Sequence, residues 1–416
     1  MSSYRHPSRL YRMLPDCPKP IFTSSHSGGF AGTDDTISAI TINRGTTGGV
    51  AVGVSPSTLE ITTPDYRSPS QGETLTCSLT APAAAWLAAR TGQTAAAITA
   101  RFHGRVGRQR VRDMGERFES SMLASSWTAQ LSHSPTKVSV VGGANVGAFL
   151  QNLMTRSYGD FIPPVRMDAL ADYGTIVQTG EADTFANLIG PYAEDYGLLI
   201  RDYRTGTPQI FTLKGRRSRA LAAAQNMMPV ARAQAYAPAE WDQANERYPR
   251  NHRILYTNTA GALESRTWGD AEDPNREVVQ HDLSHIKAAP DQVTRLGDSL
   301  RRREWTGAYS LPTVTLDIAR LLRRGRAADL IQAGQLLALS PGDPVPFAAD
   351  WPFQVRGMQF AEGIREEISP AGWTITLSLV RYSHVIGEAS PTVRPHTWDQ
   401  AADLEWDAAP GTWDSY

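Results

Sequence analysis

The strongest constraint on the fold is an alternation of apolar and polar residues on both sides of a short turn. The turn is Ser369-Pro-Ala-Gly372, and the apolar positions around it are Ile364, Ile368, Trp373, Ile375, Leu377 and Leu379. A period of two places every second side chain on one face of a strand, so one face is buried and the other is polar. Pro and Gly favour the turn itself. The segment therefore predicts a half-buried antiparallel hairpin, and it carries no reactive group.

A second turn precedes this hairpin. Pro341-Gly-Asp343 follows the apolar run 336–339 and leads into Pro-Val-Pro-Phe347. Pro presets its own φ, and Gly accepts the backbone conformation that follows. We interpret this as a turn that ends one strand and starts the next.

Length and charge limit the possible functions. The 416 residues suffice for two to four domains, each with its own core. A net charge of −1, from 41 basic and 42 acidic residues, provides no global basic field that would recruit nucleic acid. No apolar run approaches the roughly 20 residues of a membrane-spanning helix, and no apolar segment of a secretory signal begins the sequence. We expect a soluble product that is made in a cytoplasm.

The two cysteines, Cys17 and Cys77, are too few for a disulfide framework or a zinc site. Cys77 lies in Thr-Leu-Thr-Cys-Ser-Leu-Thr, which is a strand pattern, so we predict that it is a small core residue.

Short strands dominate the first third of the sequence. After a Pro-, Ser- and Gly-containing start, of which 24–33 is expected to be flexible, alternating runs recur at roughly ten-residue spacing, a pattern typical of a sandwich or barrel. These runs are 37–45, 50–54, 57–63, 72–80 and 97–111, and 118–131 continues the pattern.

The middle of the sequence has mixed character. Helical spacing predicts helices over 146–153 and 183–197. A hairpin is expected next, followed by a linker-like Ala/Arg stretch and a return to strands, with one charged amphipathic helix. The hairpin strands are 198–203 and 209–213, and the linker-like stretch is 216–225. The later strands are 252–258 and 311–318, and the amphipathic helix is 290–305.

Few residues suggest catalytic or metal chemistry. His281 and His285 would share one face of a helix, but the glutamate of a zinc protease is absent, so a structural role is favoured over a metal site. Glu366 and Glu367 would point to opposite faces of a strand, so we expect them to cap or be solvated and not to act as glycosidase acids. The arginine-rich runs 301–303 and 320–326 are interpreted as solvated faces or subunit contacts.

The last 26 residues have an unusual composition. Trp398, Trp406 and Trp413 are each followed by Asp, at spacings of eight and seven, within an Ala-, Asp- and Pro-rich segment too poor for a core of its own. Large aromatic residues are seldom left in water, and Trp is a common interface anchor. The sequence is compatible with a docking peptide for a partner or with a tail that packs back onto its own domain.

Four passages together resemble the hub or minor tail proteins of phage tail tips and baseplates, in particular those of siphophages infecting high-GC bacteria. They are the run 37–45 with Phe102–Val106, the helix-hairpin pattern from Thr184 to Phe211, the Pro341-Gly-Asp-Pro-Val345 strand start, and the closing hairpin from Val355 to Leu379. Their order and spacing span roughly residues 37 to 386.

The resemblance implies a mainly β chain with an α+β insert: two β-barrel-like hub domains and a helix-hairpin insert domain. The boundaries that we predict are 1–36 for an N-terminal arm, 37–140 for the first barrel, 141–228 for the insert, 229–390 for the second β-rich hub domain and 391–416 for the Trp-Asp docking tail.

The function implied is that of a structural, non-enzymatic ring. Such hubs are homotrimers that join the sixfold tail tube to the threefold tip around the DNA exit channel. The expected partners are a distal tail ring above, tip or receptor-binding proteins below, and the tape measure in the lumen. The expected location is the virion tail, assembled in the host cytoplasm. We expect no cofactor, no metal ion, no sequence-specific nucleic acid and no membrane span.

Three alternatives stay open from the sequence. Some tip proteins of this class carry a peptidoglycan hydrolase, although the hub pattern uses almost the whole length here. A carbohydrate-binding receptor module is favoured by the β character and the ten Trp residues, although Trp86, Trp127, Trp305 and Trp373 fall in patterns that predict burial. A cellular injection machine derived from a phage would have the same sequence features as a phage tail.

Overall fold

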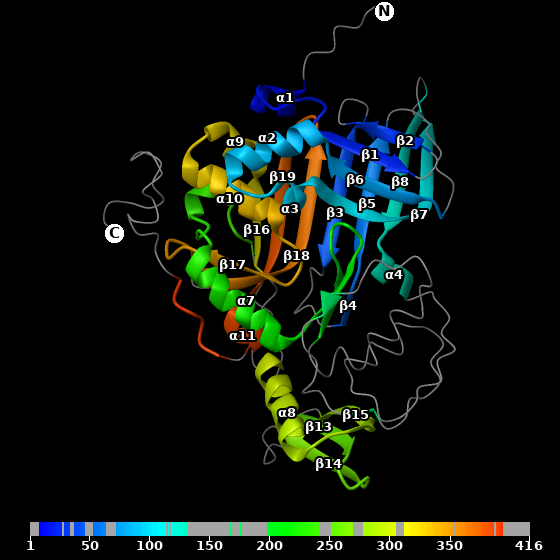
Figure 1. Ribbon diagram of the computed structural model, residues 1–416, viewed down its shortest axis with the longest axis vertical. Helices are drawn as coiled ribbons and strands as arrows, with labels where there is room; N and C mark the ends of the chain where they lie inside the picture. Colours follow the sequence, from blue (N-terminus) through cyan, green and yellow to red (C-terminus); the bar gives the residue numbers. More distant parts are fainter. Residues whose placement is uncertain are drawn as a thin grey trace, which may run out of the picture.

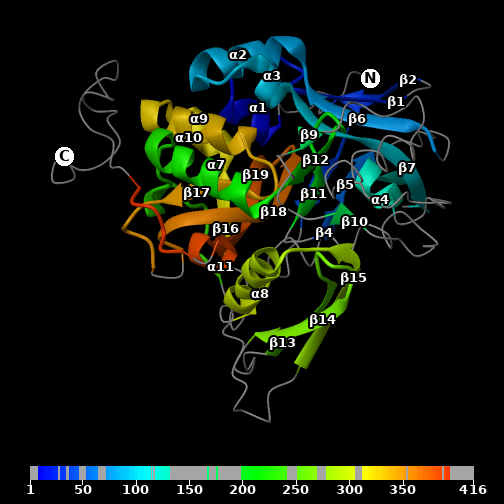
Figure 2. The same cartoon turned by 60° about the horizontal axis from the view of Figure 1, so that its bottom comes forward.

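The protein is described from a computed structural model (Figures 1 and 2). The structure describes residues 8–26, 29–33, 37–45, 53–63, 72–113, 115, 118–131, 166–167, 175–176, 198–240, 251–268, 278–304, 312–352, 355–386 and 388–393.

The main body is built on one curled, eleven-stranded antiparallel sheet (Figure 1). Its order is β16-β19-β18-β3-β5-β8-β7-β6-β1-β2, and β17 pairs with β18. The strands are β1 Phe22–His26, β2 Gly29–Thr33, β3 Ala39–Gly45, β5 Ser57–Thr63, β6 Thr74–Leu79, β7 Ala100–Asp113, β8 Phe118–Ser125, β16 Thr313–Asp317, β17 Asp343–Phe347, β18 Gly357–Ser369 and β19 Gly372–Arg381. The prediction of a mainly β chain is confirmed.

The closing hairpin forms as predicted. β18 and β19 are antiparallel, with Ile368 opposite Trp373 and Ser369 opposite Gly372, so that two residues make the turn. Trp373, Ile375 and the two leucines that follow at every second position are fully buried. The sequence alternates because one face of the strand lies in the core and the other does not.

The sheet joins residues from both ends of the chain. β3 pairs along six positions with β18, so strands of the first predicted barrel and of the second predicted hub domain are hydrogen-bonded neighbours. Because the sheet runs through both β-rich blocks, their separation into two barrel domains, with the boundaries given above, stays a prediction.

Helices pack around this sheet (Figures 1 and 2). Their bounds are α1 Arg9–Met13, α2 Ala81–Thr91, α3 Ala95–Thr99, α4 Trp127–Leu131, α7 Leu213–Asn226, α9 Ile318–Arg324, α10 Ala327–Ala338 and α11 Tyr382–Ile386. The expectation that 24–33 is flexible was wrong for its described residues, which belong to β1 and β2. The N-terminal segment also contributes Leu10, Ile21 and Phe22 to the core. Phe22 meets Trp373 edge to face, with 4.8 Å between ring centroids.

Three segments expected from sequence to be strand or linker are helices, and those expectations were wrong. The run 336–339 that was taken for a strand belongs mostly to α10, where Ala333, Leu336 and Leu337 are buried at helical spacing. The linker-like stretch 216–225 lies within α7, because Ala and Arg are strong helix formers and Thr212 caps the first turn. Residues 127–131 form α4 and do not continue the preceding strand.

The insert hairpin also forms as predicted. β11 (Leu199–Asp202) and β12 (Pro208–Phe211) are antiparallel, and β4 (Gly53–Ser55) and β9 (Arg166–Met167) add parallel edges to make a four-stranded sheet. The helices predicted over 146–153 and 183–197 lie outside the described residues.

A smaller unit carries a second four-stranded sheet, at the bottom of Figure 1. It contains β10 Thr175–Ile176, β13 Asn251–Thr257, β14 Leu263–Trp268, β15 Val278–Lys287 and the amphipathic helix α8 Pro290–Glu304. The predicted helix is confirmed, and its Val293 and Leu296 are buried.

The close approach of α10 to α2 gives a test of the packing. A Cβ atom on Gly334 would lie 2.6 Å from Thr91 Cβ, whereas one on Gly107 would meet nothing within 4 Å. We expect Gly334→Ala to lower the free energy of unfolding by about 1 to 3 kcal/mol through overpacking, although Ala is the better helix former. Gly107→Ala serves as the control, and chemical denaturation measures both. Equal stability of the two variants would contradict the close packing.

Candidate interaction surface

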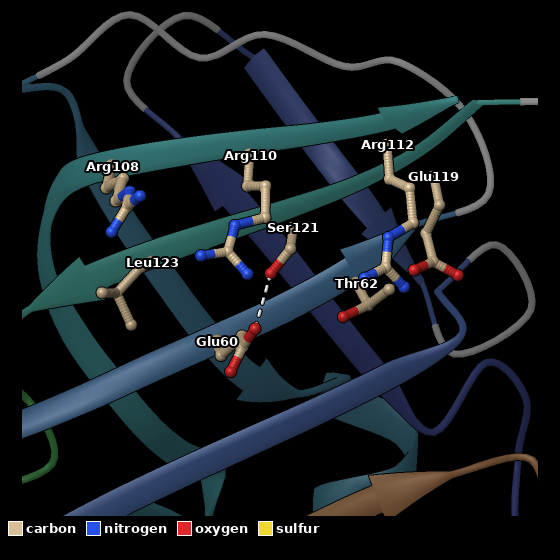
Figure 3. A pocket seen from close by; sticks show the side chains of 8 residues that line it. All are labelled: Glu60, Thr62, Arg108, Arg110, Arg112, Glu119, Ser121 and Leu123. Atoms are coloured by element: carbon tan, nitrogen blue, oxygen red, sulfur yellow. Dashed lines mark hydrogen bonds between the residues drawn. The ribbon is translucent and has the colours of Figure 1, made fainter. Parts of the chain in front are cut away.

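The most distinctive surface lies on the outer face of β5, β8 and β7 (Figure 3). A β-bulge between Val106 and Arg108 shifts the register of β7 against β8. Before the bulge Val106 is buried; after it Arg108, Arg110 and Arg112 are all exposed. The bulge therefore moves the even-numbered positions from the core face to the outer face. We call these three residues the arginine ladder.

The arginine ladder borders a shallow pocket of about 410 Å³. Arg108 lies opposite Leu123, Arg110 opposite Ser121 and Arg112 opposite Glu119 on β8. The floor is completed by Glu60 and Thr62 of β5, and Ser121 Oγ donates a 2.6 Å hydrogen bond to Glu60 Oε1 (Figure 3).

The electrostatics of the pocket favour an acidic ligand. Three guanidinium groups stand against two carboxylates, Glu60 and Glu119. Within the part of the chain that the structure describes, the arginines of the ladder form no ion pair. Guanidinium groups bind carboxylates and phosphates in a planar, bidentate manner, so this face fits a partner that carries acidic groups.

The same part of β7 lies beyond the pairing of β7 with β6. β6 pairs with β7 only from Ala100 to Arg105, and no described strand pairs with this side of β7 beyond Val106. On the opposite face from the ladder, Val111 is 43% exposed and Phe118 at the tip of the hairpin is 54% exposed. This strand thus presents charge on one face and apolar groups on the other. The alternation Arg-x-Arg-x-Arg was the signal in the sequence that could have indicated it.

The site residues predicted from sequence are not brought together by the described structure. Trp398, Trp406 and Trp413 lie outside the described residues. Of the tryptophans expected to be buried, Trp373 and Trp127 are buried, Trp86 is half-buried, and Trp305 lies outside the described part.

The histidine pair is not arranged as expected. Residues 281–285 belong to strand β15, so the prediction that His281 and His285 share a helix face was wrong. His281 Nε2 instead lies 2.9 Å from Nδ1 of His252 on the neighbouring strand β13. Among the described residues no group of three or more His, Cys, Asp or Glu side chains could hold a metal ion. Both Cys17 and Cys77 are buried, as predicted for Cys77.

The acidic pair was half correctly predicted. Glu366 and Glu367 point to opposite faces of β18 as expected, and Glu367 is exposed beside Arg365. Glu366, however, is neither solvated nor a cap, because it is completely buried.

Glu366 is the centre of a buried ion cluster. Its Oε2 accepts from Arg44 Nη2 and from Arg101 Nη2, both at 2.6 Å, and its Oε1 accepts from Trp373 Nε1 at 3.0 Å. Burial by itself raises the pKa of Glu366, but the guanidinium groups of Arg101 and Arg44 outweigh it and hold the pKa below its usual value. Burial lowers the pKa of Arg44 to about 10, so Arg44 is still charged at neutral pH.

The cluster also ties the insert hairpin to the main body. Arg101 Nη1 donates to the carbonyl oxygen of Leu337 at 2.8 Å, and the same oxygen accepts from Arg204, which lies in the turn after β11. Arg204 Nη2 donates in turn to the carbonyl oxygen of Leu339 at 2.7 Å. The orphan carbonyls at the C-terminal end of α10 are thus satisfied by two arginines that lie far apart in the sequence.

Glu366→Gln tests this cluster. The substitution leaves two buried guanidinium groups without a counter-charge, so we expect it to lower the free energy of unfolding by about 3 to 5 kcal/mol. The adjacent Glu367→Gln is the matched control and should change it by no more than about 0.5 kcal/mol. Since the pKa of Glu366 is lowered in the folded state, the stabilisation is present above its unfolded value of 4.5 and is lost as the pH falls through the folded value. Denaturation curves that give the same stability for both variants would refute the role of the cluster.

Asp202 gives a pH dependence of the opposite sign. Burial raises the pKa of Asp202 to about 6 from 3.8, although Thr128 donates to its carboxylate from the backbone nitrogen at 3.0 Å and from the hydroxyl. The protonated form is therefore favoured in the folded state. We expect stability to decrease as the pH rises from about 4 through 6, by at most about 3 kcal/mol. Asp202→Asn should remove this part of the pH dependence, measured by denaturation between pH 4 and 7.5. An unchanged pH profile in the variant would contradict the assignment.

Comparison with known proteins identifies the fold. No family model matches the sequence, and neither does any curated protein sequence. The 43 kDa tail protein of prophage MuSo2 from Shewanella oneidensis superposes with a TM-score of 0.56 at 14% identity, over 88% of this chain and 99% of that chain. The tail protein from Neisseria meningitidis MC58 gives a TM-score of 0.56 at 12% identity, over 89% and 99%. The chain shares the fold of these tail proteins. In its described part, no helix is both long and apolar enough to cross a membrane.

Proposed function

We propose that this protein is a structural component of a phage tail, positioned at the tail tip or baseplate. The observation that carries the proposal is the extent of the structural match. Nearly all of each tail protein superposes on nearly nine tenths of this chain, so no large part of the fold is left to serve a different purpose.

The use of the acidic residues supports a non-enzymatic role. Glu362 and Glu366, the two buried glutamates of β18, are ion-paired with Arg216 and with Arg44 and Arg101. A general acid or base needs a pKa near the working pH and access to a substrate. Both carboxylates are buried away from any substrate, and the pKa of Glu366 is lowered and not raised. Their role is to pair with buried arginines inside the protein.

The finer form of the proposal is a homotrimeric hub ring. Each chain would contribute two β-rich blocks, one from β3, β5, β6, β7 and β8 and one from β16 to β19. Six blocks in a trimer would match the sixfold tail tube, while the threefold tip continues below and DNA passes through the centre. The proposed partners are the distal tail ring, the tip or receptor-binding proteins and the tape measure.

The segment 391–416 is proposed as a docking tail, with Trp398, Trp406 and Trp413 as its anchors. Trp buries a large area at a low entropic cost, which makes it a frequent centre of an interface.

Mass and location test the proposal together. Light scattering of the purified protein should give three times the 45.4 kDa of one chain, about 136 kDa. Antibody labelling of purified particles should place the protein at one end of the tail. Deleting residues 391–416 should yield particles with an incomplete tip. A stable monomer with turnover on peptidoglycan would overturn the proposal, and complete, infectious particles from the deletion would exclude the docking tail.

A further inference from the structure

α1 and α9 together form a positively charged surface at one end of the main sheet. α1 packs against α9, and Leu10 N in α1 donates to the carbonyl oxygen of Pro370, in the turn of the closing hairpin, at 2.9 Å. α9 begins directly after Asp317, which lies opposite Thr374 beside the same turn. Figures 1 and 2 show the two helices near each other at this end of the molecule.

This surface carries five guanidinium groups. Arg9, Arg12, Arg320 and Arg323 are exposed, and Arg324 is half-buried. Neither helix contains an Asp or Glu residue. None of the five arginines forms an ion pair with a residue that the structure describes. We call these five residues the basic face.

The carboxylates nearest to the two helices in the sequence are already engaged. Asp317 is buried as the cap of α9, and Asp16, after α1, lies 3.9 Å from Arg90 of α2. The arginine ladder, by contrast, has Glu60 and Glu119 beside it. In a chain with a net charge of −1, the basic face is a local excess of positive charge, and it fits an acidic ligand.

The C-terminal tail of the same chain has the complementary composition. Residues 403–416 contain no Lys or Arg and four acids, namely Asp403, Glu405, Asp407 and Asp414. Trp406 and Trp413 each precede one of the acids. A guanidinium group can pair with a carboxylate and stack on an aromatic ring at the same time. The protein already uses such stacking, since the guanidinium carbon of Arg90 lies 4.5 Å from the ring centroid of Trp86.

We propose that residues 403–416 dock onto the basic face of their own chain, with the carboxylates paired to its arginines and the two tryptophans stacked on guanidinium groups. The inference rests on the docking tail proposed above and names the surface that receives it. Docking would neutralise most of the charge at this end of the molecule.

The attachment point of the tail permits this contact. Met358 N at the start of β18 donates to Ser390 Oγ, so the last described residues lie at the end of β18 away from the closing turn. Glu367, which is level with the start of α9, is roughly 30 Å from Met358 along the strand. Residues 394–402 span at most about 31 Å when fully extended, so the segment from Asp403 onward can reach the basic face. Figures 1 and 2 show the last described residues on the side of the molecule that carries α9 and α10, and β7 on the other side.

Attachment to the same chain favours this contact over one with a neighbouring copy. A short flexible linker holds its ligand at an effective concentration on the order of millimolar. Exposed ion pairs are individually weak, so several of them must act together, and a tethered segment can use them best. Salt screens such pairs, so the docked state should weaken at high ionic strength.

Disulfide trapping in the full-length protein tests the proposal. The reporter chain carries Arg323→Cys on α9 and Ala408→Cys in the tail, while the native Cys17 and Cys77 are buried. We expect its internal disulfide to form at least tenfold faster than in a chain with Arg110→Cys and Ala408→Cys, whose first cysteine lies on the arginine ladder. Peptide mass mapping identifies the bond, and an unchanged molecular mass shows that it lies within one chain.

Neutralising the tail separates docking from simple reach. Asp403→Asn, Glu405→Gln and Asp407→Asn are added together to the reporter chain. They leave the length of the linker unchanged, so a tail that merely reaches α9 would be trapped as fast as before. Docking through charge predicts that the internal disulfide forms at least fivefold more slowly, and that about 1 M NaCl slows the reporter chain in the same way.

A matched control loses the same amount of charge away from α1 and α9. It carries Glu60→Gln, Asp113→Asn and Glu119→Gln, on β5, β7 and β8, in the reporter chain. This chain should be trapped as fast as the reporter.

The outcomes separate this inference from the proposed function. A trapping rate that the tail substitutions leave unchanged would rule out docking on the basic face. Covalent dimers as the main product would place the tail on a neighbouring copy and would equally overturn docking within one chain. Neither result affects the proposal of a phage tail component, which fails only if the protein is absent from the tail.

Discussion

The burial of Glu366 between Arg44 and Arg101 is the interaction on which the rest of the structure depends. The three residues come from β18, β3 and β7, and Trp373 of β19 completes the set. A charge of this kind can leave water only if all its partners are in place, so the cluster permits one arrangement of these four strands. Arg101 and Arg204 then fix the end of α10 and the insert hairpin to the same point.

The charged groups of the interior and of the outer face of β7 are used differently. Several arginines inside the body are paired with carboxylates, such as Arg216 with Glu362 and Arg201 with Asp343. The arginine ladder is different, because the bulge after Val106 turns three guanidinium groups outward without a partner among the described residues. The body is thus held together by buried ion pairs, whereas the arginine ladder leaves positive charge on its surface.

Prediction from sequence succeeded where one face of a strand is buried. The hairpins at β18–β19 and β11–β12 follow directly from alternation and turn residues, and α8 follows from its helical period. Prediction failed for α10 and α7, where short Leu- and Ala-rich runs fit either a strand or a linker until their full length is considered. It failed also for residues 281–285, because the spacing of two histidines says nothing about whether the backbone is helical.

The sequence by itself determined the local elements, because the period of apolar residues and the turn chemistry act within a few positions. It also contained the alternating charge pattern of β7. Only the tertiary structure decided that Glu366 is buried, that β3 joins β18 across more than three hundred residues, and that the arginine ladder faces outward. Each of these features depends on which strands become neighbours. Packing and the partners available for a buried charge decide the order of the strands, and no local sequence pattern contains this information.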